Sequence, residues 1–255
     1  MILSICAVIR HIYIMSESST AKRAVILAGG RGTRLKPYTV VLPKPLMPVG
    51  DYPILEIIIR QLRRHGFSHI TLAVNHQANL IKAFFGDGKT WDLKVDYSLE
   101  STALSTIAPL RLIPDLPEHF ILMNGDVLTD LDLNSFWNEH VAENRLFTIA
   151  AAEREENAEY GVLHTDEANI LTGFEEKPVN RYLVSMGVYV VSKRILSLIP
   201  QAQRYGFDDL MTDLLARGER VHVRPYGGYW LDIGRPDDYA RAVEDFENRK
   251  QAFLS

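Results

Sequence analysis

The architecture can be inferred from Ala24-Val25-Ile26-Leu27-Ala28-Gly29-Gly30-Arg31-Gly32-Thr33-Arg34-Leu35, where an apolar run of strand length is followed at once by a glycine-rich turn. From Arg23 onward, short apolar runs alternate with amphipathic segments of helical period, which is typical of a mainly parallel sheet covered by helices. Residues 53–65 carry apolar side chains at helical spacing, and Gly66 follows where a helix C-cap belongs. The sequence therefore predicts an α/β fold with a mostly parallel central sheet.

The same patterns predict the remaining elements. We expect further strands over residues 70–74, 94–97, 120–123, 147–151, 161–164, 170–175, 183–191 and 221–224, and helices over residues 77–85, 207–216 and 236–248. The fully apolar run 120–123 ends in Asn-Gly-Asp, which indicates a central strand that delivers Asp126 to the carboxyl edge of the sheet. Ligands of open α/β sheets bind at that edge.

Composition limits the function classes. The chain has 255 residues, 47% of them hydrophobic, with a formal net charge of -4 and a single cysteine, Cys6. It has no basic run of the kind that follows a phosphate backbone, so nucleic acid is not the expected partner. One cysteine excludes a disulfide framework, and we expect a cytoplasmic protein.

The first residues form an apolar stretch that Arg10 and His11 interrupt, and the stretch is too short to span a bilayer. It lacks the basic region and the small-residue cleavage site of a signal peptide. We therefore expect residues 1–20 to be a dispensable extension, residues 21–255 to form a single catalytic domain, and no association with a membrane.

Gly29, Gly30 and Gly32 allow two interpretations of the turn after the first strand. Their backbone N–H groups could approach an anionic ligand closely, or the glycines could merely serve a turn with positive φ. Arg31 and Arg34 add the positive charge that a triphosphate needs. The spacing is neither Gly-x-Gly-x-x-Gly nor a Walker loop, which excludes an NAD-dependent oxidoreductase.

A second unusual stretch, Pro43-Lys44-Pro45-Leu46, holds a lysine between two prolines, which stiffens the backbone and aims one charge. Together with Gly30-x-Gly32-Thr33-Arg34-Leu35, it resembles the signature of the sugar-1-phosphate nucleotidylyltransferases. The resemblance covers roughly residues 22–246 and continues through Asn124-Gly125-Asp126, Glu175-Glu176-Lys177-Pro178, Gly187-Val188-Tyr189 and Trp230-Leu231-Asp232-Ile233-Gly234-Arg235-Pro236. Within the family, the sequence most resembles those of short bacterial enzymes related to mannose-1-phosphate guanylyltransferase.

This resemblance implies a three-layer Rossmann-like nucleotidyltransferase fold and the transfer of a nucleotidyl group from a nucleoside triphosphate to a sugar 1-phosphate, with release of pyrophosphate. It implies phosphate contacts by Arg34, Lys44 and Lys177, sugar contacts by Gly161 and Glu176, and Mg²⁺ binding by Asp126 and Asp232. It further implies a nucleotide site made of Leu27, Ala28, Gly29, Gly30, Gly32, Thr33, Glu100 and Ser105. Each aspartate alone would be an ordinary turn or N-cap residue. A homo-oligomer is left open.

The chain departs from its family in Leu104-Ser105-Thr106-Ile107-Ala108-Pro109-Leu110, where relatives usually carry glycine at the positions of Ser105 and Ala108. If the first position needs a left-handed backbone, Ser105 costs about 1–2 kcal/mol there. Glu100, near this loop, could accept hydrogen bonds from guanine N1 and N2, so GTP is the favoured triphosphate.

The alternative is a catalytically impaired homologue that binds a nucleotide sugar and regulates a true enzyme. Such a protein would be free to lose the charged positions of the site. The chain retains all five of them, which favours an active enzyme: Arg34, Lys44, Asp126, Lys177 and Asp232.

Overall fold

The computed structural model describes residues 21–75, 77–100, 102–201 and 203–254. Its centre is a seven-stranded sheet with the strand order β12-β8-β11-β6-β1-β4-β5. Only β11 runs against its neighbours, so the prediction of a mostly parallel sheet is confirmed. The strands are β1 (Lys22–Leu27), β4 (Phe67–Val74), β5 (Lys94–Leu99), β6 (His119–Asn124), β8 (Phe147–Asn157), β11 (Val179–Ser192) and β12 (Val221–Tyr226).

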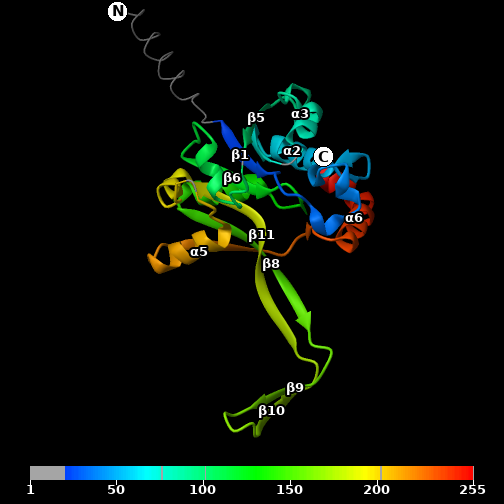
Figure 1. Cartoon of the computed structure of the whole chain (residues 1–255), viewed down its shortest axis with the longest axis vertical. Helices are drawn as coiled ribbons and strands as arrows, with labels where there is room; N and C mark the ends of the chain where they lie inside the picture. Colours follow the sequence, from blue (N-terminus) through cyan, green and yellow to red (C-terminus); the bar gives the residue numbers. More distant parts are fainter. Residues whose placement is uncertain (1–20, 76, 101, 202, 255) are drawn as a thin grey trace, which may run out of the picture.

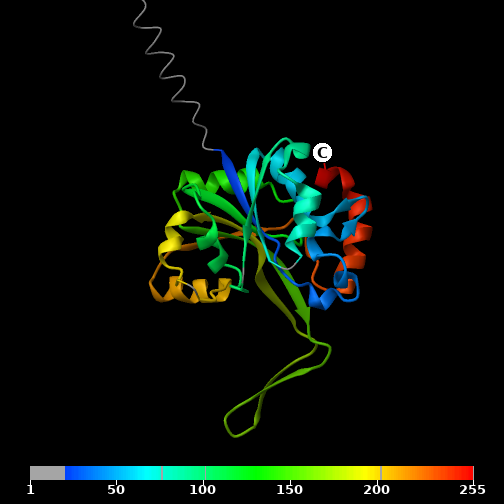
Figure 2. The same ribbon diagram turned by 45° about the horizontal axis from the view of Figure 1, so that its top comes forward.

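Side chains of the central strands alternate between two hydrophobic cores, one on each face of the sheet. In β1, Ala24 and Ile26 belong to one core and Val25 to the other. A strand buried on both faces has no polar side to its sequence, which explains the unbroken apolar run. One face is covered by α2 (Ile54–Arg64), α3 (Ala78–Phe85), α4 (Leu133–Ala142) and α6 (Pro236–Leu254), and the other by α5 (Phe207–Ala216) with the 3-10 helices η5 (Ala108–Leu112) and η6 (Lys193–Ser197) (Figures 1 and 2). The fold thus has three layers.

The ends of α2 and α3 follow the predicted signals, whereas α6 continues to Leu254, beyond the predicted end at residue 248. Gly66, with φ 84°, comes directly after the C-cap residue of α2, and Gly86, with φ 51°, is the C-cap of α3. Both positions use the left-handed backbone that ends a helix without a Cβ penalty. The helix predicted over residues 207–216 has the same limits in the structure.

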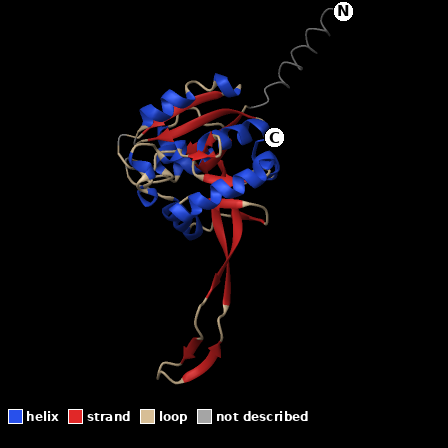
Figure 3. Cartoon of the chain, turned by 90° about the vertical axis from the view of Figure 1, so that its right-hand side faces the viewer, coloured by secondary structure: helices blue, strands red, loops and turns tan. Residues whose placement is uncertain are grey.

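Strands β8 and β11 are longer than predicted, because they continue beyond the sheet as an antiparallel pair. Their register runs from Ser185 opposite Ala151 out to Val179 opposite Asn157. The projecting part is exposed on both strands. Its β8 half is charged and its β11 half mixes apolar and polar residues, so neither half has the unbroken apolar run from which the core strands were predicted. It carries a small hairpin of β9 (Val162–Thr165) and β10 (Leu171–Glu175) at its far end. We call residues 153–183 the arm, and Figure 3 shows it projecting from the body.

Several short elements were not predicted from the sequence. Helix α4 begins after Asp132, whose side chain accepts a hydrogen bond from the Ser135 backbone N–H, an ordinary N-cap. Strand β7 (Val127–Thr129) pairs antiparallel with β13 (Trp230–Asp232), and β2 (Pro48–Val49) pairs with β3 (Tyr52–Pro53). The predicted extension, residues 1–20, lies outside the described residues. Within the described part of the chain, no helix is both long and apolar enough to cross a membrane.

Candidate active site

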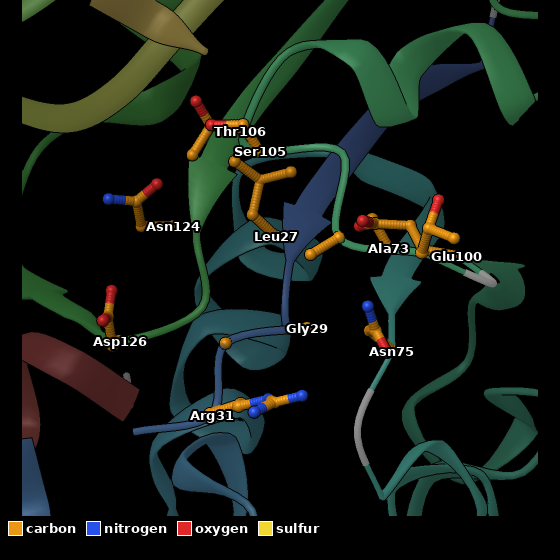
Figure 4. Close-up of a pocket in the computed structure, with 13 residues that line it drawn as sticks. Leu27, Gly29, Arg31, Ala73, Asn75, Glu100, Ser105, Thr106, Asn124 and Asp126 are labelled. Carbon is orange, nitrogen blue, oxygen red and sulfur yellow. The ribbon is translucent and has the colours of Figure 1, made fainter. Parts of the chain in front are cut away.

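A cavity of about 700 Å³ opens at the carboxyl edge of the sheet. Leu27, the last residue of β1, lies beside Ala73 of β4 and Asn124 of β6 in the strand register. Figure 4 shows these residues around the cavity. The lining is formed by Leu27, Gly29, Gly30, Arg31, Ala73, Asn75, Glu100, Thr102, Ala103, Ser105, Thr106, Asn124 and Asp126. Asp126 thus lies at the edge that the sequence predicts for it.

Both interpretations of the glycine-rich turn apply, but to different glycines. Gly32 has φ 60°, and a Cβ there would lie 2.8 Å from Cγ2 of Thr39, whose hydroxyl donates to the Gly32 carbonyl at 2.7 Å. A Cβ on Gly29 would come within 3.2 Å of the Asn75 backbone nitrogen. Gly30 has neither constraint, since no atom of the described chain lies within 4 Å of its Cβ position. Packing therefore explains why positions 29 and 32 are glycine, whereas Gly30 leaves room for a ligand to approach from the cavity.

Lys44 is positioned by the turn that its flanking prolines build. It begins the 3-10 helix η3 (Lys44–Leu46), with Pro43 as the extended N-cap residue. Only 8% of Lys44 is exposed, and its Nζ forms an ion pair with Oδ2 of Asp126. A buried ammonium needs such a partner, because an isolated charge in the interior is strongly unfavourable.

The pairing of β7 with β13 brings Asp232 next to Asp126. Asp232 is opposite Val127 in the ladder, and the Ile233 N–H donates to the Asp126 carbonyl at 3.1 Å. Burial raises the pKa of Asp232, and the Asp126 carboxylate raises it further, while Lys44 and Arg34 lower it. Oδ1 of Asp126 is buried without a hydrogen-bond partner in the described residues.

These observations fit a divalent cation between the two carboxylates. A partially buried, mutually repelling pair with an unpartnered oxygen needs more positive charge than Lys44 supplies. The described residues contain no cluster of three or more His, Cys, Asp or Glu side chains suited to a metal. Two carboxylates suffice for Mg²⁺, which keeps waters and substrate phosphates as its remaining ligands.

Two arginines add positive charge around this centre. Arg31 lines the cavity (Figure 4). Arg34, on the 3-10 helix η1 (Thr33–Leu35), has its guanidinium close to Gly234, where a Cβ would lie 3.6 Å from Nη1 of Arg34 and 3.5 Å from Oδ2 of Asp232. The Arg34 guanidinium and the Asp232 carboxylate therefore both lie beside Gly234. Such a cluster is suited to bind a polyphosphate.

The two departures from the family pattern differ in their backbone. Ser105 has φ 73°, so it occupies the left-handed region that was expected for this position. Ala108 starts η5 without a left-handed backbone, is 4% exposed, and donates its N–H to the Tyr205 carbonyl at 3.0 Å. Only the loss of glycine at Ser105 therefore carries a conformational cost.

Glu100, predicted to contact the base, lies on the cavity wall directly after β5 and is 9% exposed. The Leu104 backbone N–H donates to its Oε2 at 3.2 Å. Burial raises the pKa of Glu100, and this hydrogen bond opposes the rise. No hydrogen bond from another described residue reaches its other carboxylate oxygen, Oε1, and Glu100 and Asn75 both line the cavity (Figure 4).

Three predicted residues lie elsewhere, because Gly161, Glu176 and Lys177 belong to the arm and are away from the cavity (Figures 1 and 3). A Cβ on Gly161 would lie 2.5 Å from Cε2 of Phe174, so packing inside the hairpin already requires this glycine. Lys177, with φ 46°, is exposed in the turn between β10 and β11. Within one chain, these residues and the cavity are not brought together.

Asn75, which lies across from Gly29 on the cavity wall, was not among the residues predicted for the site. The signal for it was available. Asn75 directly follows β4, as Asn124 ends β6, and polar side chains at the carboxyl ends of buried parallel strands meet at the ligand edge.

Comparison with known proteins identifies the family of the chain. The family model described as nucleotidyl transferase matches residues 23–249. UTP–glucose-1-phosphate uridylyltransferase from Synechocystis is 31% identical over 248 residues, and the match covers 89% of this chain but 64% of that protein. D-glycero-alpha-D-manno-heptose 1-phosphate guanylyltransferase from Campylobacter jejuni is 29% identical over 85% of this chain and 96% of its own. The crystal structure of HddC from Yersinia pseudotuberculosis complexed with GMP-PN superposes with a TM-score of 0.68 and 27% identity, covering 88% of this chain and 99% of that one. With a family match that spans nearly all of its described residues, this chain belongs to the nucleotidyl transferase family.

Proposed function

We propose that the protein transfers a nucleotidyl group from a nucleoside triphosphate to a sugar 1-phosphate, forming a nucleoside diphosphate sugar and pyrophosphate. The observation that carries the proposal is the convergence of Arg34, Lys44, Asp126 and Asp232 beside one cavity at the carboxyl edge of the sheet. The names of the two relatives described above support the same reaction class. A regulatory homologue would not need this charged centre.

In the proposed reaction, an oxygen of the sugar phosphate attacks the α-phosphorus of the triphosphate. One P–O bond forms, the bond from the α-phosphorus to the bridging oxygen breaks, and pyrophosphate leaves with the electron pair. The attacking oxygen is already anionic, so no nucleophilic side chain and no general base are needed. The work left to the protein is to position the two substrates and stabilise the negative charge.

Arg31 and Arg34 are placed to bind the triphosphate and the departing pyrophosphate, since both lie on the turn that borders the cavity. Lys44 lies deeper and is held by Asp126, so its ammonium is fixed before a substrate binds. Bound between Asp126 and Asp232, Mg²⁺ would supply Lewis-acid stabilisation of charge on the phosphate oxygens. A charge that is positioned in advance needs no reorganisation during the reaction.

GTP is the triphosphate that we propose. Glu100 is buried on the cavity wall and already accepts one hydrogen bond through Oε2, which fixes the orientation of its carboxylate. Its second oxygen can accept from guanine N1 and N2, and uracil or thymine offers no matching pair of donors. The sugar-phosphate guanylyltransferase among the relatives supports this choice, and the uridylyltransferase is the competing case that the assay must exclude.

The test is a pyrophosphate-release assay over a grid of GTP, UTP, dTTP and CTP with several sugar 1-phosphates, with and without Mg²⁺. We expect activity that requires both substrates and the cation, with GTP giving the highest kcat/KM. Asp51→Asn is a matched control, because Asp51 is an exposed aspartate that pairs with Lys250 at 2.9 Å outside the cavity. No pyrophosphate release from any combination would refute the reaction.

A further inference from the structure

The arm exposes an unusual amount of apolar surface. Large hydrophobic side chains that are about half exposed or more gather on it: Tyr160, Leu163, Ile170, Leu171, Phe174, Val179, Tyr182 and Leu183. Scattered apolar residues are normal on a protein surface, but a contiguous set marks an interaction site. A two-stranded ribbon without a covering layer is also marginally stable in water. The arm therefore needs a partner surface.

In the structure, the arm projects from the body and lies away from the cavity of its own chain (Figures 1 and 3). β8 and β11 leave the body as one continuous ladder from Ser185 opposite Ala151 to Val179 opposite Asn157. At its base, the Arg154 guanidinium lies 4.7 Å from the centre of the Trp230 ring, and further out Arg181 pairs with Glu155 at 2.9 Å. The ladder and these two contacts hold the arm in its projecting position.

Charge indicates what covers the arm. Residues 153–183 contain eight acidic side chains, Glu153, Glu155, Glu156, Glu159, Asp166, Glu167, Glu175 and Glu176, against three basic ones, Arg154, Lys177 and Arg181. The turn that borders the cavity has the opposite charge, since Arg31, which lines the cavity, and Arg34 and Lys36, which follow it in the chain, are all exposed. Next to this basic turn lies an exposed apolar stretch, Tyr38, Val40, Val41 and Leu42, packed against it through Thr39 and Gly32. The body therefore offers both features that would complement the arm.

We propose that the partner is a second copy of this chain, and that each arm lies across the cavity rim of the other protomer. The acidic and apolar arm would cover the basic turn and the apolar stretch beside it. The exchange would deliver Glu176 and Lys177 to the sugar-phosphate side of the other protomer's cavity. This inference rests on the proposed function, because it assigns the two halves of one transferase site to two chains. Lys177 would contact the sugar phosphate, and Glu176 would accept from a sugar hydroxyl.

The decisive experiment is complementation between two inactive variants. Asp126→Asn removes a proposed cation ligand from the cavity but leaves the arm intact, and Lys177→Ala removes the proposed phosphate contact from the arm but leaves the cavity intact. The two are co-expressed with different affinity tags, and the mixed dimer is isolated by two successive affinity steps. If arms are exchanged, one site of each mixed dimer combines an intact cavity with an intact arm. We expect about half of the wild-type activity per dimer, and strongly reduced activity for either variant alone.

Lys193→Ala is the matched control for Lys177→Ala, because Lys193 is also an exposed lysine and lies on η6, outside both the arm and the cavity. It should keep wild-type activity. An inactive mixed dimer, with both variants melting like the wild type, would show that each arm serves its own chain and would overturn the inference. Full activity of Lys177→Ala alone would also overturn it.

A second measurement separates this inference from the proposed function. Replacing residues 158–178 with a two-residue Asn-Gly turn removes the hairpin while leaving the β8–β11 ladder to close on itself. Light scattering should then show a monomer where the full chain is a dimer. A monomeric full chain at micromolar concentration would refute the exchange. If the wild-type protein is inactive with every substrate pair, the proposed function is refuted instead, whatever the oligomeric state.

Discussion

Replacing Ser105 with glycine tests a strained position on the cavity wall. Ser105 has φ 73°, and a non-glycine residue in the left-handed region costs about 1–2 kcal/mol. Glycine removes that cost but gains conformational freedom in the unfolded chain, which takes back about 0.4–1 kcal/mol. No hydrogen bond of the serine hydroxyl to another described residue is lost. The expected result is a gain of about 0.5–1 kcal/mol in the free energy of unfolding.

For a chain of this size, that gain corresponds to a rise in Tm of about 1–3 °C. Thermal unfolding followed by circular dichroism measures the shift, and urea unfolding gives the free energy independently. Ser105→Ala is the matched control, because alanine removes the hydroxyl and keeps the Cβ that makes this backbone unfavourable. Alanine should therefore leave Tm unchanged or lower it slightly.

The same variant has a kinetic consequence under the proposed function. Ser105 lines the cavity, so removal of its side chain gives the base more room, and KM for the nucleotide should fall with kcat nearly unchanged. A lower Tm, or equal shifts for glycine and alanine, would refute the strain. A higher nucleotide KM for Ser105→Gly would show that the hydroxyl contacts the base, and the preference for GTP would then lose its basis.

Three further predictions concern the charged and buried polar groups. Asp126→Asn and Asp232→Asn should each leave the fold intact, as checked by circular dichroism, and lower kcat by at least about 100-fold, because each removes a proposed cation ligand; wild-type rates at saturating Mg²⁺ would refute the metal site. Glu100→Gln should reduce the kcat/KM preference for GTP over UTP, since the amide can present a donor where an acceptor is required; an unchanged ratio would remove Glu100 from base recognition. Burial, followed by the charges of His119 and Arg145, lowers the pKa of His140 from 6.5 to about 3. The folded state therefore keeps His140 neutral, so the free energy of unfolding has its full value above pH 6.5 and decreases as the pH falls toward 3. Between about pH 6.5 and about pH 5 the loss should approach about 2 kcal/mol, and His140→Gln should show a smaller decrease in urea unfolding; equal decreases would refute the assignment.

The body of the fold was predictable because its signals are local. The runs around Val25 and residues 120–123 are apolar on both faces, and Gly66 and Gly86 end their helices with the backbone that the sequence indicates. Strand pairing at the carboxyl edge then places Leu27, Asn124 and Asp126 together without further information. Turn chemistry and period thus identified both the sheet and the position of the cavity.

What the sequence could not predict depends on contacts between distant segments. Strands β7 and β13 are each three residues long and exist only because they pair with one another. Strands β8 and β11 continue past the core through mutual hydrogen bonds. The exposed part of β8 is charged and that of β11 mixes apolar and polar residues, so neither has the apolar run of a core strand. Residues that the family resemblance assigns to one site therefore lie apart in the chain's structure, with Lys44 in the body and Lys177 on the arm (Figure 3). A linear motif states which residues occur together, and topology decides where they are in space.

The small ladder of β7 and β13 also has a consequence for a chain that is still being synthesised. Asp126 emerges from the ribosome about a hundred residues before its companion carboxylate, and strand β13 and helix α6 come last. Until they arrive, the earlier aspartate can pair with Lys44 but has no second carboxylate beside it. Under the proposed function, cation binding and the transfer reaction would therefore require the completed polypeptide. A product shortened at its carboxyl end would be inert instead of partly active.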